Sequence, residues 1–241
     1  MILEIYKDAF GYALKDGSTL LKLGVLSLFS FLIIPFIFLL GYEYRIIKTA
    51  TEGMINGNET LPEFNNYTTM FKDGLKVLAV SIIYVLISVV IFLLLFFIGL
   101  TTNMESIIVL AFIALIILTI ISLIFSALAV THMAANNGSI NAAFHIRELK
   151  DIMQSIGVLK LVGSYFGIFL ISAVISFVVY VFVFAVVGIL GFAVSYVYVD
   201  IVPAFIWALS IMADLVVALV VWPYLNIFSC RSYGLIYNLR E

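Results

Sequence analysis

The feature that most constrains the fold is the run from Val77 to Leu100, which is apolar and carries no charged side chain. It exceeds the ~20 apolar residues that a helix needs to cross the hydrocarbon core of a bilayer. Similar runs recur along the chain, so that 65% of all residues are hydrophobic and only 11% are charged. Soluble domains carry about 25% charged residues. The sequence therefore predicts an all-α fold, a polytopic transmembrane helical bundle.

We expect one integral membrane domain across all 241 residues, because the polar stretches between the apolar runs are too short for a separate soluble domain. About five spans are predicted, at residues 20–41, 77–100, 106–133, 158–194 and 203–228. The short polar turn between the second and third spans requires these two helices to run antiparallel. Pro35 lies inside the first run and is expected to kink it.

Three further segments place apolar residues at helical spacing beside charged ones, which is typical of helices that lie on a membrane surface. These segments are residues 2–16, 62–75 and 140–156. The second segment follows Thr60 and contains Pro62 and Glu63 near its start, a pattern that predicts a capping box. The third shows the clearest division between a charged face and an apolar face.

Lysine and arginine indicate which side of the membrane each connection occupies, because cytoplasmic loops are enriched in them. Most of the 12 basic residues follow the first span, the third span or the last span. With five spans, this pattern leaves the N-terminal Lys7, Lys15 and Lys22 outside. Alternatively, residues 20–41 turn back at Pro35 as a re-entrant hairpin, and every basic segment then lies in the cytoplasm.

One carboxylate, Asp214, lies near the middle of the last predicted span. A charge at that depth costs about 2.5–3.5 kcal/mol on insertion scales, so it must face protein or water, pair, or stay protonated. Asp214 is therefore a candidate functional residue, for a proton, an ion or a polar solute. The alternative is a structural acid that is hydrogen-bonded to Ser210, Tyr84 or Ser176.

A polar cluster follows the first predicted span. Tyr42, Tyr44 and Arg45 are candidate contacts for lipid head groups, because a guanidinium matches the geometry of phosphate. The alternative is interfacial anchoring, with a local ion pair between Glu43 and Arg45.

Gly163 and Gly167 form a GxxxG pattern, which is typical of membrane helices that pack closely. We expect these glycines to serve helix packing. Their partner helix could belong to this chain or to another one.

No nucleophile, nucleotide-binding or paired-carboxylate motif occurs, and the net charge of -2 provides no basic surface for nucleic acid. Cys230 is the single cysteine, which excludes a cysteine-cluster metal site. His132 and His145 lack the spacing of metal ligands, so the two histidines are interpreted as interfacial side chains. We therefore expect no enzyme, no cofactor, no metal site and no nucleic-acid partner.

The segments LGYEYRIIK, LPEF and FKDGLKV, which fall between Leu40 and Val77, resemble the membrane family DUF4013, found mainly in archaea. The resemblance extends through the AAF segment at Ala142 to Phe144 and the closing Tyr233-Gly234, and so covers most of the chain. Its most specific pieces are GY-x-x-R and LPEF. It implies a polytopic α-helical protein of the cell membrane, and it supplies no activity or active-site residues.

These features favour a multi-pass protein of the cell membrane that is not an enzyme and that organises membrane lipids or partner proteins. The partners would be other membrane proteins or further copies of the chain. The alternative is a small-solute or ion transporter or channel with Asp214 in the pathway. The uncharged second and third spans argue against a wide polar path.

Overall fold

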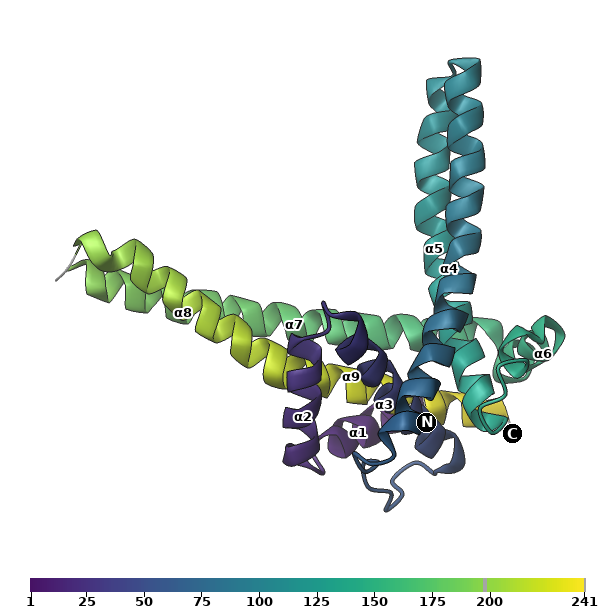
Figure 1. Ribbon diagram of the computed structural model, residues 1–241, viewed down its shortest axis with the longest axis horizontal. Coiled ribbons are helices and arrows are strands. Elements are labelled where there is room, and N and C mark those ends of the chain that lie inside the picture. The colour runs from purple at the N-terminus through teal and green to yellow at the C-terminus, as the bar shows by residue number, and fades with distance from the viewer. Residues whose placement is uncertain (197–198, 241) are drawn as a thin grey trace.

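The computed structural model describes residues 1–196 and 199–240, which form helices joined by turns, with no strand among them. Figure 1 shows a globular part from which two long helical hairpins project. We call residues 1–76, 128–162 and 222–240 the base. The helices that lie wholly within it are α1 (Ile2–Ala13), α2 (Gly17–Leu28), α3 (Ile33–Glu52), η1 (Ala142–Phe144), α6 (Ile146–Ile156), α9 (Trp222–Tyr237) and η4 (Asn238–Arg240).

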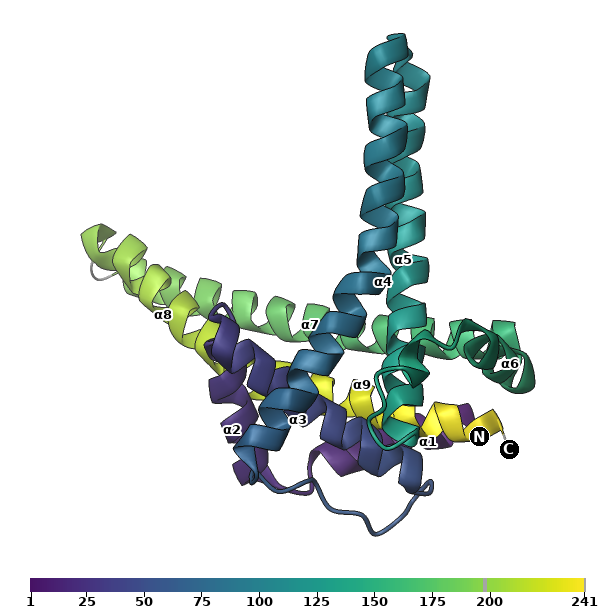
Figure 2. The ribbon, with the colours of Figure 1, turned by 45° about the vertical axis from the view of Figure 1, so that its right-hand side comes forward.

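The remaining residues form the two hairpins. The first hairpin pairs residues 77–102 of α4 (Tyr67–Thr102) with residues 105–127 of α5 (Glu105–Ala135). The second pairs residues 163–195 of α7 (Val158–Ser195) with α8 (Val202–Val216), with a short turn η2 (Val199–Ile201) before α8. The hairpins leave the base in different directions (Figures 1 and 2). Over the described residues, neither hairpin packs extensively along the other.

Four helices are long and apolar enough to cross a membrane: α4, α5, α7 and the continuous helical run Val202–Arg240. In the most apolar window of each, at most 17% of the residues are buried inside the chain, so most apolar side chains face outward. The predicted all-helical class, with helices long and apolar enough to cross a membrane, is confirmed. Within residues 1–196 and 199–240 the number of such helices is four, and they belong to the two hairpins.

The first predicted span, residues 20–41, is not one helix. α2 ends at Leu28, residues 29–32 form a turn, and α3 begins at Ile33. Pro35 lies in the first turn of α3, where its missing amide hydrogen would have no helical partner anyway. The prediction of one kinked span is therefore wrong.

The chain instead reverses between α2 and α3, as Figure 1 shows. Lys15, just before α2, donates hydrogen bonds to the carbonyls of Gly57 and Glu59, just after α3. The start of α2 and the end of α3 therefore meet. This arrangement agrees with the re-entrant alternative, although the reversal lies before Pro35 rather than at it.

The predicted surface helix at 62–75 is wrong in its first half, since residues 53–66 form a loop and α4 begins only at Tyr67. Tertiary contacts explain the difference. The hydroxyls of Tyr12 and Tyr42 donate to the carbonyls of Thr60 and Pro62, which a helix would have used. The segments at 2–16 and 140–156 are helical as expected, with ends at Ala13 and Ile156.

The base is packed closely where its helices cross. α3 and α4 meet at Gly41 and Gly74: a Cβ at Gly41 would overlap the carbonyl of Met70, and one at Gly74 would overlap the carbonyl of Ile37. Only glycine allows the two backbones to approach this closely.

Arg231 joins the separate segments of the base and is fully buried. Its Nε lies 3.1 Å from Oδ2 of Asp8 in α1, and its Nη2 lies 3.0 Å from Oε2 of Glu59. Nη2 also donates to the carbonyl of Met54, and the guanidinium lies 4.6 Å from the centre of the Tyr12 ring. Arg231 therefore holds α1, the loop 53–66 and α9 together.

The last predicted span, residues 203–228, continues to Arg240 and changes its helical type midway. A five-residue π-helical segment, η3 (Val217–Val221), separates α8 from α9. α2 packs directly on this segment, because a Cβ at Gly24 would overlap the carbonyl of Leu219.

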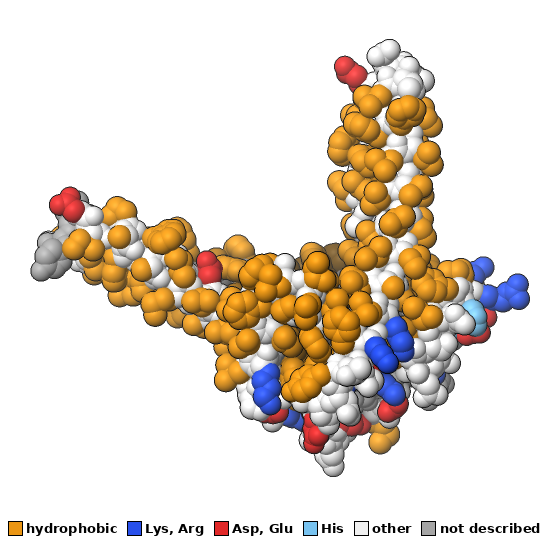
Figure 3. All heavy atoms as spheres, viewed as in Figure 1, with side chains coloured by type: hydrophobic (Ala, Val, Ile, Leu, Met, Phe, Trp, Pro, Cys, Tyr) orange, Lys and Arg blue, Asp and Glu red, His pale blue; other side chains and the backbone are white. Residues whose placement is uncertain are grey.

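Charge divides the base from the hairpins. All 12 basic residues belong to the base, whereas the charged residues of the hairpins are the acids Glu105, Asp200 and Asp214. Figure 3 shows the lysine and arginine side chains gathered on the base and acidic groups near the hairpin ends.

Candidate functional site

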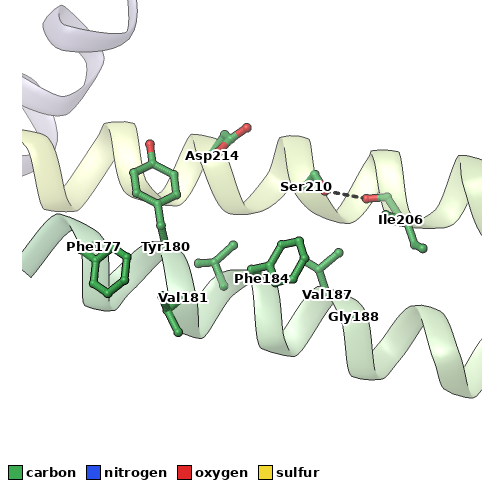
Figure 4. Close-up of a pocket in the computed structure, with 10 residues that line it drawn as sticks. Phe177, Tyr180, Val181, Phe184, Val187, Gly188, Ile206, Ser210 and Asp214 are labelled. Carbon is green, nitrogen blue, oxygen red and sulfur yellow. Dashed lines mark hydrogen bonds between the residues drawn. The ribbon is translucent and has the colours of Figure 1, made fainter.

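Asp214 lies on the second hairpin, and its side chain is exposed. It borders a cavity of about 560 Å³ between α7 and α8. Figure 4 shows its carboxylate directed away from α7, with the hydroxyl of Tyr180 on the same side of the hairpin. The other residues that line this cavity are mostly apolar: Phe177, Val181, Val183, Phe184, Val187, Gly188, Ile206 and Ser210.

The hydrogen bond that the alternative role of Asp214 requires, to Ser210, Tyr84 or Ser176, is not formed in the described part of the chain. The hydroxyl of Ser210 donates to the carbonyl of Ile206 on its own helix, as the dashed line in Figure 4 shows. The hydroxyl of Tyr84 donates to the carbonyl of Ala143 in the base. Asp214 is thus a surface carboxylate on an apolar hairpin.

Gly163 and Gly167 play different roles. A Cβ at Gly167 would lie 2.5 Å from the hydroxyl of Tyr6, which donates to the carbonyl of Ser164. Gly167 therefore makes room for a side chain of α1, rather than for a membrane helix. Gly163 is exposed, and a Cβ there would meet nothing within 4 Å.

Tyr42 and Tyr44 are buried, so the prediction that their side chains contact lipid head groups is wrong. The ring of Tyr42 stacks on Phe64 at 4.2 Å between centres. Arg45 donates to three loop carbonyls, those of Glu63, Asn65 and Asn66. These residues hold the loop 53–66 against α3.

The alternative pair between Glu43 and Arg45 does not form either. Residues two apart on a helix point to different sides, so Arg45 faces the loop while Glu43 lines a cavity of about 440 Å³. Burial raises the pKa of Glu43 to about 7. Sequence reasoning missed Glu43 as a cavity residue because an ion pair with the nearby Arg45 explained its charge.

Sequence reasoning also missed a cluster around His132, which is buried, whereas His145 is exposed. Nε2 of His132 lies 3.0 Å from Oε2 of Glu148, and its Nδ1 lies 2.6 Å from the hydroxyl of Tyr237. The hydrogen bond from His132, together with the nearby His145, holds the pKa of Glu148 below its ordinary value. The cluster joins α5, α6 and α9.

A cavity of about 350 Å³ beside this cluster is lined by both acidic and basic groups, including Asp151 and Arg240. Its mixed charge complements no single class of ion. Among the described residues, no group of three or more His, Cys, Asp or Glu side chains is arranged to hold a metal ion.

These observations define the class of protein: an all-helical chain with a polar base and four helices that are long and apolar enough to span a membrane. Comparison with known proteins adds the family. Residues 27–188 match the family described as "Protein of unknown function (DUF4013)", and the chain belongs to that family. The predicted resemblance is confirmed.

The chain is also similar to an uncharacterised protein of Methanocaldococcus jannaschii, MJ0233. The two are 27% identical over 214 residues, which cover 83% of this chain and 70% of that protein. No solved structure matches the chain.

Proposed function

We propose that this is a multi-pass protein of the cell membrane, with both hairpins in the bilayer and the base at the cytoplasmic face. Its basic residues support this orientation, because all 12 belong to the base. The hairpin ends carry acids, Glu105 and Asp200, and no cation. An even number of spans also places both termini on one side, in agreement with their common position in the base (Figure 2).

Within the membrane, the protein acts as a non-enzymatic component that organises lipids and partner proteins. The observation that carries this proposal is the outward-facing apolar surface of the hairpins, of which at most 17% of residues in the most apolar windows are buried. Spans of a compact bundle would cover one another. Here each hairpin offers its sides to lipid and to other membrane helices, including those of further copies of the chain.

Cysteine labelling tests the orientation. In a Cys230→Ser background, single cysteines replace Thr102 at the end of the first hairpin and Asn58 in the base loop, two exposed positions. A membrane-impermeant maleimide should label Thr102→Cys in intact cells and Asn58→Cys only after permeabilisation. The reverse pattern would overturn the proposed orientation.

Co-purification tests the organising role. A tagged copy should retain an untagged copy in mild detergent, and Gly163→Leu, at an open position on α7, should reduce the retained amount severalfold. Gly11→Leu is the matched control, because Gly11 is equally open but lies on α1 in the base. Equal retention by both variants, together with the absence of other co-purified membrane proteins, would contradict the proposal.

A second candidate function is transport of an ion or small solute along the cavity beside Asp214. The exposed carboxylate favours it, while the apolar lining of the cavity opposes a wide aqueous path. Proton flux into vesicles that contain the purified protein, measured with a pH-sensitive dye, tests it. A flux that Asp214→Asn abolishes would favour transport, and the absence of flux would rule this candidate out for protons.

A further inference from the structure

A second cavity, of about 440 Å³, lies where α2 and α3 meet the C-terminal helical run. It is separate from the cavity between α7 and α8 that Asp214 borders. Its volume falls within the ~300–1,000 Å³ range of small-molecule sites. The residues that line it are Ser27, Ser30, Phe36, Leu39, Leu40, Glu43, Ala218, Trp222 and Asn226.

The polar side chains of this cavity have unused hydrogen-bonding capacity. The hydroxyl of Ser27 is buried and has no partner among the described residues. Within the same part of the chain, the side chains of Ser30, Glu43 and Asn226 also form no hydrogen bond. Buried polar groups are normally paired, so the unpaired hydroxyl of Ser27, beside three half-buried polar side chains without a hydrogen bond around the same cavity, points to a ligand.

The charge of the cavity points to a cation. Glu43 is its single charged lining residue, and burial raises the pKa of this carboxyl to about 7 because no cation of the chain offsets the loss of water. The nearest charged neighbours in sequence are engaged elsewhere, since Arg45 binds the loop carbonyls. A bound cation would complement the carboxylate.

The walls of the cavity indicate an organic cation rather than a metal ion. Calcium requires six to eight oxygen ligands and magnesium a near-ideal octahedron, whereas one carboxylate is present here. Two aromatic side chains, Phe36 and Trp222, instead supply faces on which an alkylated ammonium group can rest. Trp222 is 57% exposed, which leaves the cavity open on that side.

We propose that this cavity binds an ammonium-bearing ligand, with Glu43 as its counter-ion, Phe36 and Trp222 against the cation, and Ser27, Ser30 and Asn226 as hydrogen-bonding partners. The ammonium group belongs either to a lipid head group or to a free amine. This inference is independent of the organising role proposed above.

Tryptophan fluorescence tests the site directly. The chain has two tryptophans, so Trp207→Phe leaves Trp222 as the single reporter. Titration of this variant in non-ionic detergent with tetramethylammonium chloride should produce a saturable change in emission. Potassium chloride controls for ionic strength, and tert-butanol controls for a neutral group of similar shape. A change that either control reproduces would overturn the proposal.

Glu43→Gln, in the same background, removes the charge with little change in shape. We expect it to weaken binding by about tenfold or more, because the cation loses its counter-charge in a half-enclosed cavity. Asp214→Asn is the matched control, and it should bind as the parent does. Unaltered affinity in Glu43→Gln would overturn the proposal. If Glu43→Gln fails to fold, Phe36→Leu replaces it, and a severalfold loss is expected because one aromatic face against the cation is removed.

Reconstitution distinguishes the two sources of the ammonium group. In phosphatidylglycerol vesicles, whose lipid lacks an amine, free tetramethylammonium should bind. If it binds equally in phosphatidylcholine vesicles, the ligand is a free amine, whereas lost binding there indicates that the lipid head group already occupies the site. Absence of saturable binding in both would overturn the proposal.

Discussion

The base and the second hairpin differ in whether a charged side chain is buried and paired. Arg231 in the base is fully buried and is paired with Asp8 and Glu59, which come from segments far apart in sequence. Asp214 in the second hairpin is exposed and has no hydrogen bond among the described residues. The base is thus defined by specific polar contacts between distant segments, whereas the second hairpin is defined by its apolar composition.

The first hairpin lies between these extremes. Its helices are joined by two pairs of hydroxyls, Ser88 with Ser122 at 2.7 Å and Ser81 with Ser126 at 3.2 Å. The second hairpin has a cavity where such contacts would lie, and its Ser210 bonds to its own helix. The first hairpin therefore supplies its own partner helix, and the second leaves a face open to other molecules.

The largest effect is expected from Arg231→Met. The substitution leaves Asp8 and Glu59 without their cation, and breaking a buried ion pair costs about 3–5 kcal/mol. Denaturant titration in mixed micelles should show this loss of unfolding free energy. Arg147→Met, at an exposed position in the same base, is the control and should stay within about 0.5 kcal/mol. Equal stability of the two variants would show that the buried ion pairs of Arg231 do not stabilise the base.

Two glycine-to-alanine substitutions should have opposite signs. Gly74→Ala places a Cβ against the carbonyl of Ile37 and should destabilise the protein by about 1–3 kcal/mol, as overpacking does. Gly163→Ala meets nothing within 4 Å and should stabilise α7 by up to about 1 kcal/mol through helix propensity. The same titration measures both. If Gly74→Ala does not destabilise the protein, the crossing of α3 and α4 is not tightly packed.

A smaller effect is expected from Ser88→Ala in the first hairpin. Interhelical hydrogen bonds in membrane proteins contribute about 0.6 kcal/mol on average, so the loss should be of that order. The double variant with Ser122→Ala should be less destabilised than the sum of the two single variants, because both hydroxyls of the pair are then gone. Additive losses would mean that the two hydroxyls do not interact.

The smallest effect is expected from Asp214→Asn. Because the carboxylate is exposed and has no partner in the described chain, the free energy of unfolding should change by less than about 0.5 kcal/mol. A loss as large as that of Arg231→Met would show that Asp214 is buried in an assembly of several copies, and it would direct attention to that interface.

Local composition predicted the hairpins well, because a charge-free run such as Val77 to Leu100 has few alternatives to a membrane-crossing helix. Residues 20–41 were harder to predict. Their length and hydropathy suit a span, but the turn at 29–32 brings α3 against α4 at Gly41 and Gly74. Such tertiary contacts leave little trace in a hydropathy pattern.

The candidate sites show the same limit. Asp214 could be found because a charge inside an apolar run is conspicuous. Glu43 could not, since it stands beside Arg45 in sequence and only the direction of its side chain separates the two. The one available signal was spacing: no basic residue follows Glu43 three or four positions along the helix.

The π-helical segment Val217–Val221 has a geometric consequence for the last helical run. A π turn holds one residue more than an α turn, and one extra residue rotates everything beyond it by about 100° around the axis. The π segment thus changes the side of the helix axis on which the residues beyond it lie, while the helical run itself continues. In an uninterrupted α-helix of the same sequence, Arg231 would lie about 100° away from its present side of the axis. Deletion of one residue that converts the π turn to an α turn should therefore keep Arg231 pointed into the base and Asp214 on its present side of the hairpin.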